Sequence, residues 1–393
     1  MFQMKDVLPY KEELIQHRRY LHQHPELGFD VANTHDYIQH QLSQWGIQVL
    51  PHVGKNSLLG IIENGVGPII GLRADIDALP ILEENTELDY CSLVPGKMHA
   101  CGHDAHTAML LMTAKFLVDH RDSWKGTVKL IFQEAEEGPN PGGAYGVVNS
   151  HLVDDVETFY AFHVAPMYPS GSVAIKKGEA MASADTIKIT LQGRGAHAAY
   201  PHLSIDPIVM AAEVIMGAQT IVSRRKNPLD LAVLTIAQVH AGTTHNIIPS
   251  TAYLEGTVRT FSNSLRKEID QALQALLDGV AKKSGGSYSY EYIYEYDPTI
   301  NTPSVCNDIE EVVTQTLGKE QFHEIKLPSM GAEDFGKYSA LKQGAIMWLG
   351  IAKDENTSQS LHHPRFQMDE NALPTGVLIF ANLVCRQGKE FKR

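Results

Sequence analysis

The sequence has few cysteines and no long apolar run. Its four cysteines are scattered without framework spacing, which argues against a disulfide-stapled secreted fold and fits a reducing compartment. No apolar run approaches the roughly 18 residues of a membrane-spanning helix. The stretch from Met1 to His24 mixes Lys, Glu, Arg and His without an apolar core. We therefore expect a cytoplasmic protein with no signal peptide and no membrane partner.

Positive charge is also in short supply. The chain has 33 Lys and Arg against 46 Asp and Glu, which gives a formal net charge of −13. Such an acidic surface repels phosphate backbones, so we expect no nucleic-acid partner. The composition, 43% hydrophobic and 20% charged, is that of a globular protein. At about 100–200 residues per domain, the length predicts two domains.

Chemistry-bearing residues concentrate in one stretch, Met98–His106, which reads Met-His-Ala-Cys-Gly-His-Asp-Ala-His. A helical apolar pattern follows, so we expect Asp104 to cap a helix and Cys101 and His103 to lie in the loop before it. Alternate residues of an extended loop point to the same side, so the thiolate and the imidazole can share one centre. That pair suits zinc or a similar first-row metal. A core cysteine with surface histidines is the alternative, and the density of ligand types argues against it.

Two carboxylates follow a short apolar run. The runs Ser57–Ile62 and Pro68–Leu72 are separated by an Asn-Gly pair and predict a strand pair with a tight turn. The second run leads directly to Asp75 and Asp77. Acids just past a buried strand indicate a functional site, and hydrogen bonding that only orders the loop is the alternative.

A cluster of acids follows the next apolar run, Thr127–Gln133. Glu134, Glu136 and Glu137 stand close together there. Their charges would repel one another strongly unless cations neutralised them. A solvated acidic turn is the alternative, and the apolar strand before the acids argues against it.

Strand, loop and helix patterns alternate through this part of the chain, which is typical of a mostly parallel sheet covered by helices. In such sheets ligands bind at the carboxyl ends of the strands, where the acids and the cysteine–histidine loop would meet. His163 ends the buried run Thr158–Val164. A lone histidine at that position is more often a core residue than a ligand. His163 is a candidate ligand because the other candidate ligands are expected at the same edge of the sheet. The same pattern resumes after Pro298 and carries His362 in a Leu-His-His-Pro sequence.

The middle of the chain has a different pattern. The order strand, helix, strand, strand, helix, strand predicts an α+β ferredoxin-like domain inserted into the α/β domain. The expected segments are 1–181 and 297–393 for the two parts of the parallel-sheet domain and 182–296 for the inserted domain. The insertion would explain why His163 and His362 stand so far apart. Within it, His197 in a Gly-rich loop and Asn246 are weak signals by themselves.

Together these stretches resemble the dinuclear metallo-amidohydrolases of the aminoacylase, hippurate-hydrolase and auxin-conjugate-hydrolase group. The matching stretches follow the family order along nearly the whole chain: His22–Gly28, Arg73–Pro80, Met98–His106, Phe132–Gly138, Phe162–Val164, Gly195–His202, Gly331–Phe335 and Leu361–Pro364. The resemblance implies a catalytic domain split by a smaller lid domain that also dimerises. It implies two divalent metal ions, usually zinc, with manganese, nickel or cobalt also used by this group.

The resemblance also implies roles for single residues. The implied metal ligands are Cys101, His103, Glu137, His163 and His362. Glu136 matches the general base, and His197 matches a lid histidine that stabilises the oxyanion and comes from the partner subunit. The residues themselves do not separate Glu136 from Glu137, or His362 from His363. Neighbouring residues of an extended loop point opposite ways, so we expect one glutamate to ligate while the other acts as base.

Further positions complete the expected site. Asp77 is expected to orient a ligand, Asn246 and Arg259 to hold the substrate carboxylate, and Gly331 to line the substrate site. Arginine is favoured over asparagine by its forked geometry. One departure concerns Glu134, which stands where the family usually has proline. Three consequences are open: Glu134 raises the pKa of Glu136, it favours a cationic substrate, or its side chain points away from the site and has no effect there.

These residue types fit amide hydrolysis. Two metal ions lower the pKa of a bound water and clamp a tetrahedral intermediate, while a carboxylate moves the proton. We expect a homodimer that removes the acyl group from N-acetyl or N-benzoyl amino acids. The alternatives are a dipeptidase or exopeptidase on the same scaffold, a thiol hydrolase with Cys101 as nucleophile, and a non-catalytic metal-binding protein. Chelator-insensitive activity would support the thiol hydrolase, whereas Glu136 beside a full ligand set argues against the non-catalytic protein.

Overall fold

The computed structural model describes residues 1–390. These residues form two compact units. The first unit comprises Met1–Ala180, Ile300–Pro328 and residues 334–390, and the second comprises Met181–Thr299 and Ser329–Glu333. The last three residues of the predicted segment 297–393 lie outside the described residues.

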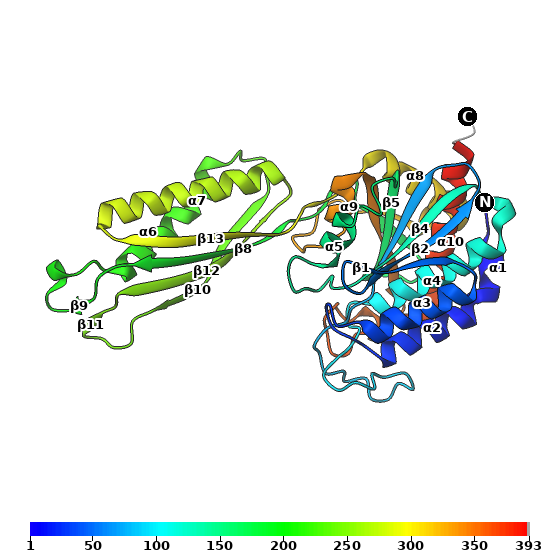
Figure 1. Cartoon of the computed structure of the whole chain (residues 1–393), viewed down its shortest axis with the longest axis horizontal. Helices are drawn as coiled ribbons and strands as arrows, with labels where there is room; N and C mark the ends of the chain where they lie inside the picture. Colours follow the sequence, from blue (N-terminus) through cyan, green and yellow to red (C-terminus); the bar gives the residue numbers. More distant parts are fainter. Residues whose placement is uncertain (391–393) are drawn as a thin grey trace. The chain divides into compact units, whose positions relative to one another are not determined.

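An eight-stranded sheet forms the centre of the first unit (Figure 1). In spatial order its strands are β1 (Gln48–Val53), β2 (Ser57–Asn64), β4 (Gly126–Gln133), β3 (Ile69–Asp75), β5 (Thr158–Pro169), β16 (Gln343–Ala352), β6 (Val173–Ile175) and β15 (Phe322–Glu324). The four strands in the middle, β4, β3, β5 and β16, are parallel to one another. Antiparallel pairs join β1 to β2, β2 to β4, and β16 to β6. The predicted mostly parallel sheet is therefore confirmed.

Helices cover both faces of this sheet (Figure 1). The helices of the unit are α1 (Met4–Val7), α2 (Lys11–Gln23), α3 (Ala32–Gln44), α4 (His103–Asp119), α5 (Gly143–Asn149), α8 (Pro303–Leu317), α9 (Gly336–Leu341) and α10 (Leu373–Glu390). Alternate residues of β4 pack into two cores: Leu130 and Phe132 with α2, α4 and α10, and Ile131 with α5 and α9. Burial on both faces explains why the central strands are apolar almost without interruption.

The predicted pairing of Ser57–Ile62 with Pro68–Leu72 is wrong, because β4 lies between these two strands. It pairs antiparallel with β2 and parallel with β3. Nearly every residue of β4 is buried, so its backbone needs a hydrogen-bonded neighbour on each side. The Asn-Gly segment therefore crosses over β4, and the true hairpin joins β1 to β2.

A four-stranded antiparallel sheet and two helices form the second unit (Figure 1). In spatial order its strands are β10 (Ala232–Ala241), β12 (Thr251–Thr260), β8 (Ala184–Gln192) and β13 (Ser287–Tyr296), and its helices are α6 (Pro207–Thr220) and α7 (Asn263–Ser284). Ile189 and Leu254 of the sheet pack with Val214 of α6 and Leu277 of α7. The strand order and the chain order are those of a ferredoxin-like fold, which confirms the predicted fold class.

Short strands complete the two units. They pair β9 (Ala196–His197) with β11 (Ile247–Ile248) and β7 (Gly178–Met181) with β14 (Thr299–Asn301). Gly331, expected in the second part of the α/β domain, belongs to the second unit. The reason is local, since the Ala182 N–H group donates to the carbonyl oxygens of Ser329 and Gly331, at 3.0 Å each. Among the described residues, no helix is both long and apolar enough to span a membrane.

Candidate metal centre

The cysteine–histidine loop turns into helix α4 at Gly102. This glycine is the N-cap residue, with φ of +83°, a conformation that favours glycine. A Cβ atom there would lie 2.4 Å from the side chain of Val164, so no other residue fits. The turn brings Cys101 and His103 together with His163 from β5, with their donor atoms within 4.8 Å of one another.

All five implied ligands lie in one connected cluster. The groups with donor atoms within 4.8 Å of one another include Cys101–His103–His163, Cys101–Glu137–His362 and His103–Glu136–Glu137. The sulfur of Cys101 lies 3.4 Å from Nε2 of His163, and Nε2 of His362 lies 3.1 Å from Oε1 of Glu137. Residues from four separate parts of the chain therefore meet, and each has a donor type that first-row metals accept.

Backbone carbonyls fix the tautomers of two of these histidines. Nδ1–H of His103 donates to the carbonyl oxygen of Asp77, and Nδ1–H of His163 donates to that of Val164, at 2.8 Å each. In the neutral ring, each bond leaves Nε2 with a lone pair directed toward the cluster, as in metal-binding histidines. Nε2 of His103 is buried and has no hydrogen-bond partner among residues 1–390. A metal ion would satisfy this atom.

His106 is not available as a ligand, although it lies with Asp75 and His103 in a further group of possible donors. Its Nδ1–H group donates to Oδ1 of Asp75 at 2.6 Å, and its Nε2 accepts the N–H group of Val164 at 2.9 Å. Both ring nitrogens are therefore in use. Asp75 is held in turn by Arg73 at 2.9 Å. His106 thus holds the backbone of Val164, the residue whose carbonyl oxygen orients His163.

The two glutamates do not point opposite ways as predicted. Oδ1 of Asp77 accepts the N–H group of Glu136 at 2.9 Å, and Oδ2 accepts that of Glu137 at 3.1 Å. Ala135 has φ of +51°, so the loop is turned and not extended. Both carboxylates therefore reach the donor atoms around His103. Asp77 therefore contacts three residues of the cluster. Its carboxylate binds the backbone N–H groups of both glutamates, and its carbonyl oxygen binds the ring of His103.

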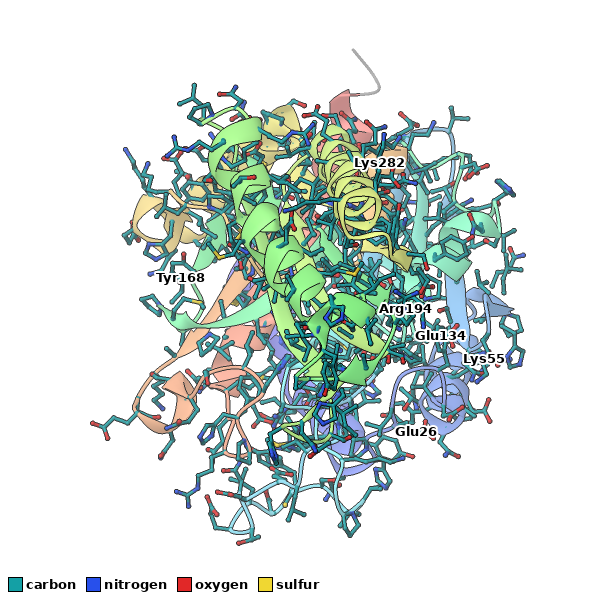
Figure 2. The ribbon with its side chains drawn as sticks, turned by 90° about the vertical axis from the view of Figure 1, so that its left-hand side faces the viewer. Glu26, Lys55, Glu134, Tyr168, Arg194 and Lys282 are labelled. Atoms are coloured by element: carbon teal, nitrogen blue, oxygen red, sulfur yellow. The ribbon has the colours of Figure 1, made fainter. Side chains whose placement is uncertain are left out.

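Glu134 lies outside these groups and faces the β1–β2 turn (Figure 2). Its carboxylate accepts the backbone N–H groups of Lys55, at 2.8 Å, and Asn56, at 2.7 Å. Burial raises the pKa of Glu134, against the effect of these bonds. Of the three consequences expected from the departure at this position, the structure supports the one in which the side chain points away.

Asp104 is not the N-cap, because α4 begins at His103. It forms a buried ion pair with Nε of Arg18 at 2.9 Å and bonds to Nδ1 of His22 at 2.7 Å. The sequence reasoning missed this contact. The available signal was the spacing of Arg18 on α2, four residues after Leu14 and three before Leu21, which places a cation on the apolar face of the helix.

A metal ion would change the protonation of Cys101 and His103. Burial raises the pKa of the Cys101 thiol well above its usual range, and Glu137 and Glu136 raise it further. Burial would lower the pKa of His103, but Asp75 and Asp77 outweigh it and raise that pKa to about 10. Buried carboxylates thus retain protons on their neighbours. Divalent cations would replace those protons, so the donor set fits a metal centre.

The remaining predicted residues lie in the second unit. His197 on β9 pairs with Ile247 on β11, and the N–H group of Ala198 donates to the carbonyl oxygen of Asn246 at 3.0 Å. His197 and Asn246 are therefore neighbours and both are exposed. Arg259 lies on β12, opposite Val233 of β10. The roles of these residues stay predictions.

Comparison with known proteins decides the family. The sequence model of Peptidase family M20/M25/M40 matches residues 71–386. The chain belongs to this family. It is 38% identical over 376 residues to N-acetylcysteine deacetylase of Bacillus subtilis (strain 168), covering 95% of this chain and 96% of that protein. It is 40% identical over 292 residues to N-acyl-L-amino acid amidohydrolase of Geobacillus stearothermophilus, covering 74% of this chain and 78% of that one.

A solved structure of the M20 family has the same fold. The Bacillus subtilis YXEP protein, described as a dinuclear metal binding peptidase, is 33% identical with a TM-score of 0.83, covering 97% of this chain and 99% of that one. The resemblance found in the sequence is therefore confirmed. The chain is a metal-dependent hydrolase of the M20 family, and the cluster around Cys101 is its candidate metal centre.

Proposed function

We propose that this M20 family enzyme hydrolyses the amide bond of N-acyl amino acids of the N-acetyl or N-benzoyl type. The products are a carboxylic acid and a free amino acid. The observation that carries this proposal is the single cluster that joins a thiol, three imidazoles and two carboxylates. The relatives named for N-acetylcysteine and for N-acyl-L-amino acids support the substrate class.

The cluster would hold two divalent ions. The proposed ligands are Cys101, His103, Glu137, His163 and His362, and zinc is the first candidate, with manganese, nickel and cobalt as alternatives. When bound, the ions supply Lewis-acid polarisation of the amide carbonyl and of the attacking water. The unpartnered Nε2 of His103, and the Nε2 of His163 directed at the Cys101 sulfur, support this assignment.

Glu136 is proposed as the general base and acid. Its carboxylate would take the proton of the attacking water and then donate it to the leaving nitrogen. The bond from its N–H group to Asp77 fixes the start of this side chain. Asp77 is therefore proposed as a positioning residue for Glu136, Glu137 and His103, because it contacts all three.

Residues of the second unit are proposed to bind substrate. His197 would donate to the oxyanion, and Arg259 and Asn246 would hold the substrate carboxylate. Gly331 would line the same site. Support comes from the pairing of the His197 and Ile247 strands, which keeps His197 and Asn246 in one exposed element.

We also propose a homodimer in which His197 comes from the second copy of the chain. Within the described part of the chain, strand β10 is an edge of its sheet, with one hydrogen-bonded neighbour. Helix α6 exposes Ile208, Val209 and Met216 at 47%, 63% and 69%. An unpaired strand edge beside an apolar helix face favours association with another chain. All four cysteines are free, which supports a cytoplasmic location.

A thiol hydrolase fits the cluster less well. A nucleophilic cysteine needs a depressed pKa, whereas burial raises that of Cys101. Burial also lowers the pKa of His163, the nearest imidazole, to about 3, so this histidine would remain uncharged beside the thiol. The pair therefore lacks the imidazolium that stabilises a thiolate.

A substrate panel tests the proposal. Purified protein is assayed on N-acetyl and N-benzoyl amino acids, on dipeptides, and on N-acetyl amino acid amides that lack the free carboxylate. We expect the acylated amino acids to have the highest kcat/KM. Higher values for dipeptides would support the dipeptidase alternative, and no hydrolysis of either class would overturn the proposal.

Mixing two inactive variants tests the dimer. Chains with His197→Ala and chains with Glu136→Gln are mixed and allowed to exchange subunits. If His197 acts in the partner's site, one of the two hybrid sites has both residues and activity partly returns. Proven exchange without activity would contradict the arrangement.

A further inference from the structure

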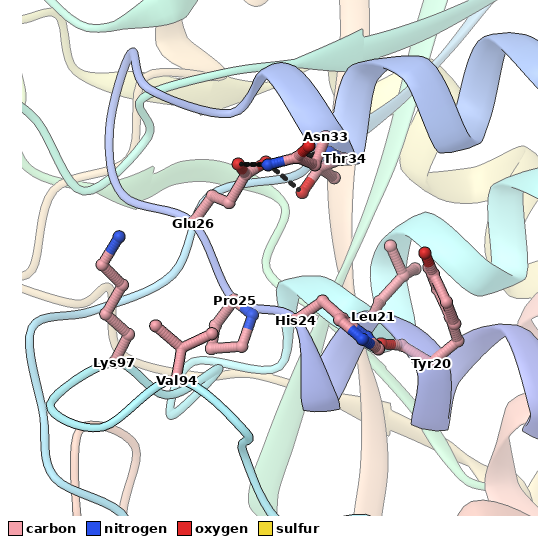
Figure 3. Close-up of a pocket in the computed structure, with 9 residues that line it drawn as sticks. All are labelled: Tyr20, Leu21, His24, Pro25, Glu26, Asn33, Thr34, Val94 and Lys97. Atoms are coloured by element: carbon pink, nitrogen blue, oxygen red, sulfur yellow. Dashed lines mark hydrogen bonds between the residues drawn. The ribbon is translucent and has the colours of Figure 1, made fainter.

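The first unit contains a pocket of about 430 Å³ that the proposed chemistry does not use (Figure 3). Its walls come from the end of α2, the start of α3 and the loop that carries Val94 and Lys97. None of the metal-centre residues lines it. The volume lies within the range of small-molecule sites.

Two opposite charges line this pocket without pairing. Oε1 of Glu26 accepts the Asn33 amide at 2.6 Å, and Oε2 accepts the N–H and hydroxyl groups of Thr34 at 2.8 and 3.0 Å. These bonds hold the carboxylate in place but leave its charge without a cationic partner among the described residues. The ammonium group of Lys97, likewise, forms no hydrogen bond or ion pair with any residue in the described range. A fixed anion and a free cation therefore share one cavity.

An aromatic wall completes the pocket. The ring of Tyr20 stacks on His24, with centroids 4.4 Å apart, and on Tyr37, with centroids 4.1 Å apart. Nδ1–H of His24 donates to the carbonyl oxygen of Tyr20 at 2.7 Å, which holds the imidazole ring against the tyrosine. Leu21 and Pro25 add apolar surface. Figure 3 shows Lys97 and Tyr20 at opposite sides of the view, with Pro25 between them.

We propose that this pocket binds a free α-amino acid with an apolar side chain. The ligand's ammonium group would pair with Glu26, its carboxylate with Lys97, and its side chain would pack on the face of the His24 ring that Tyr20 leaves open. A zwitterion is the smallest ligand that answers both unpaired charges, and charge-assisted hydrogen bonds are the strong ones. An ordinary carboxylate or amine would leave one of the two charges desolvated and unpaired.

Backbone hydrogen bonds join the pocket wall to the segment that carries Asp77. The carbonyl oxygen of Glu26 accepts the N–H group of Ala78 at 2.7 Å. Met98, next to Lys97, exchanges two hydrogen bonds of 3.0 Å with Leu79. An amino acid in the pocket would therefore bind against the backbone next to the residue that positions Glu136. The proposal concerns binding and does not depend on the proposed reaction.

The test is calorimetric titration of the whole protein with L-phenylalanine. Phenethylamine, which lacks the carboxylate, and 3-phenylpropionate, which lacks the ammonium group, are each expected to bind about 10- to 100-fold more weakly. Lys97→Met should weaken L-phenylalanine binding to the same degree, and Lys97→Arg should retain it. Lys267→Met, at an exposed lysine of α7, is the matched control and should bind like wild type.

Two further variants distinguish binding in this pocket from binding at the metal centre. Cys101→Ala, which removes a proposed metal ligand, should keep L-phenylalanine binding, while Tyr20→Ala, which removes the aromatic wall, should lose most of it. Circular dichroism checks the fold of each variant. The proposal is overturned if wild type does not bind L-phenylalanine, if Lys97→Met binds like wild type, or if only Cys101→Ala loses binding. None of these results bears on hydrolysis, which the substrate panel measures separately.

Discussion

Nδ1–H of His103 donates a hydrogen bond of 2.8 Å to the backbone carbonyl oxygen of Asp77. The carboxylate of the same aspartate accepts the N–H groups of Glu136 and Glu137. One residue on the segment after β3 therefore contacts a proposed ligand on α4 and both acids after β4. Because Asp77 is fully buried, few other groups could replace it in these bonds.

Asp77→Ala should weaken metal binding about 10- to 100-fold, the range seen when groups that orient ligands are removed. Both glutamate N–H groups would lose their acceptor while the bond from His103 to the backbone remains. Asp77→Asn keeps one acceptor oxygen, so its metal affinity should lie between those of Asp77→Ala and wild type. Metal titration followed by elemental analysis measures the effect. Unchanged affinity in both variants would show that Asp77 does not position the ligands.

Glu136→Gln and Glu137→Gln should have different effects. The first change removes the proposed base and should abolish nearly all turnover while metal content is kept. The second removes a proposed ligand and should lower metal content. Elemental analysis and kcat on the same preparations separate the two results. The reverse pattern would exchange the two roles, and normal turnover in both would exclude the acid–base scheme.

Glu134→Ala should lower stability and leave substrate preference unchanged. The change removes the acceptor for two backbone N–H groups of the β1–β2 turn, at a cost of about 1–3 kcal/mol. Glu63→Ala, at an exposed glutamate of β2, is the control and should cost little. Urea unfolding and kcat/KM on neutral and cationic substrates are measured. A selective loss of cationic substrates would show that Glu134 acts in the site.

Arg18→Leu should destabilise the first unit by about 3–5 kcal/mol, because it removes the guanidinium beside the buried Asp104 and leaves His22 as the remaining ion-pair partner. The neighbouring change Arg19→Leu, at a partly exposed arginine, is the matched control and should cost about 1 kcal/mol or less.

The Arg18 effect should also depend on pH. Burial raises the pKa of Asp104, but Arg18 and then His22 outweigh it and hold that pKa below its usual value of 3.8. A depressed pKa contributes stability above the unfolded value, and this stability is lost as the pH falls through the folded value. The difference between wild type and Arg18→Leu should therefore shrink in acid. A constant difference in urea midpoint from neutral pH downward would contradict this assignment.

Local patterns in the sequence led to the proposed ligands, whose donor atoms the structure brings together, and non-local pairing caused the errors. Cys101 and His103 follow directly from residue types in one loop. The position of β4 between β2 and β3 could not be read from either strand, because it depends on which partners satisfy the buried backbone of β4. The common direction of Glu136 and Glu137 depends on Asp77, about 60 residues earlier in the chain. Gly331 belongs to the second unit because its carbonyl oxygen accepts the N–H group of Ala182, about 150 residues earlier, and no local pattern indicates that contact.

Chelation with metal add-back tests the central claim most directly. Protein purified without chelator is analysed for metal, stripped exhaustively, assayed on an N-acetyl amino acid and then reconstituted with zinc, manganese, nickel or cobalt. We predict two divalent ions per chain, loss of hydrolysis on stripping and its return with at least one metal. Cys101→Ala should bind fewer ions and recover less activity. Full hydrolysis by protein shown to contain no metal would contradict the account.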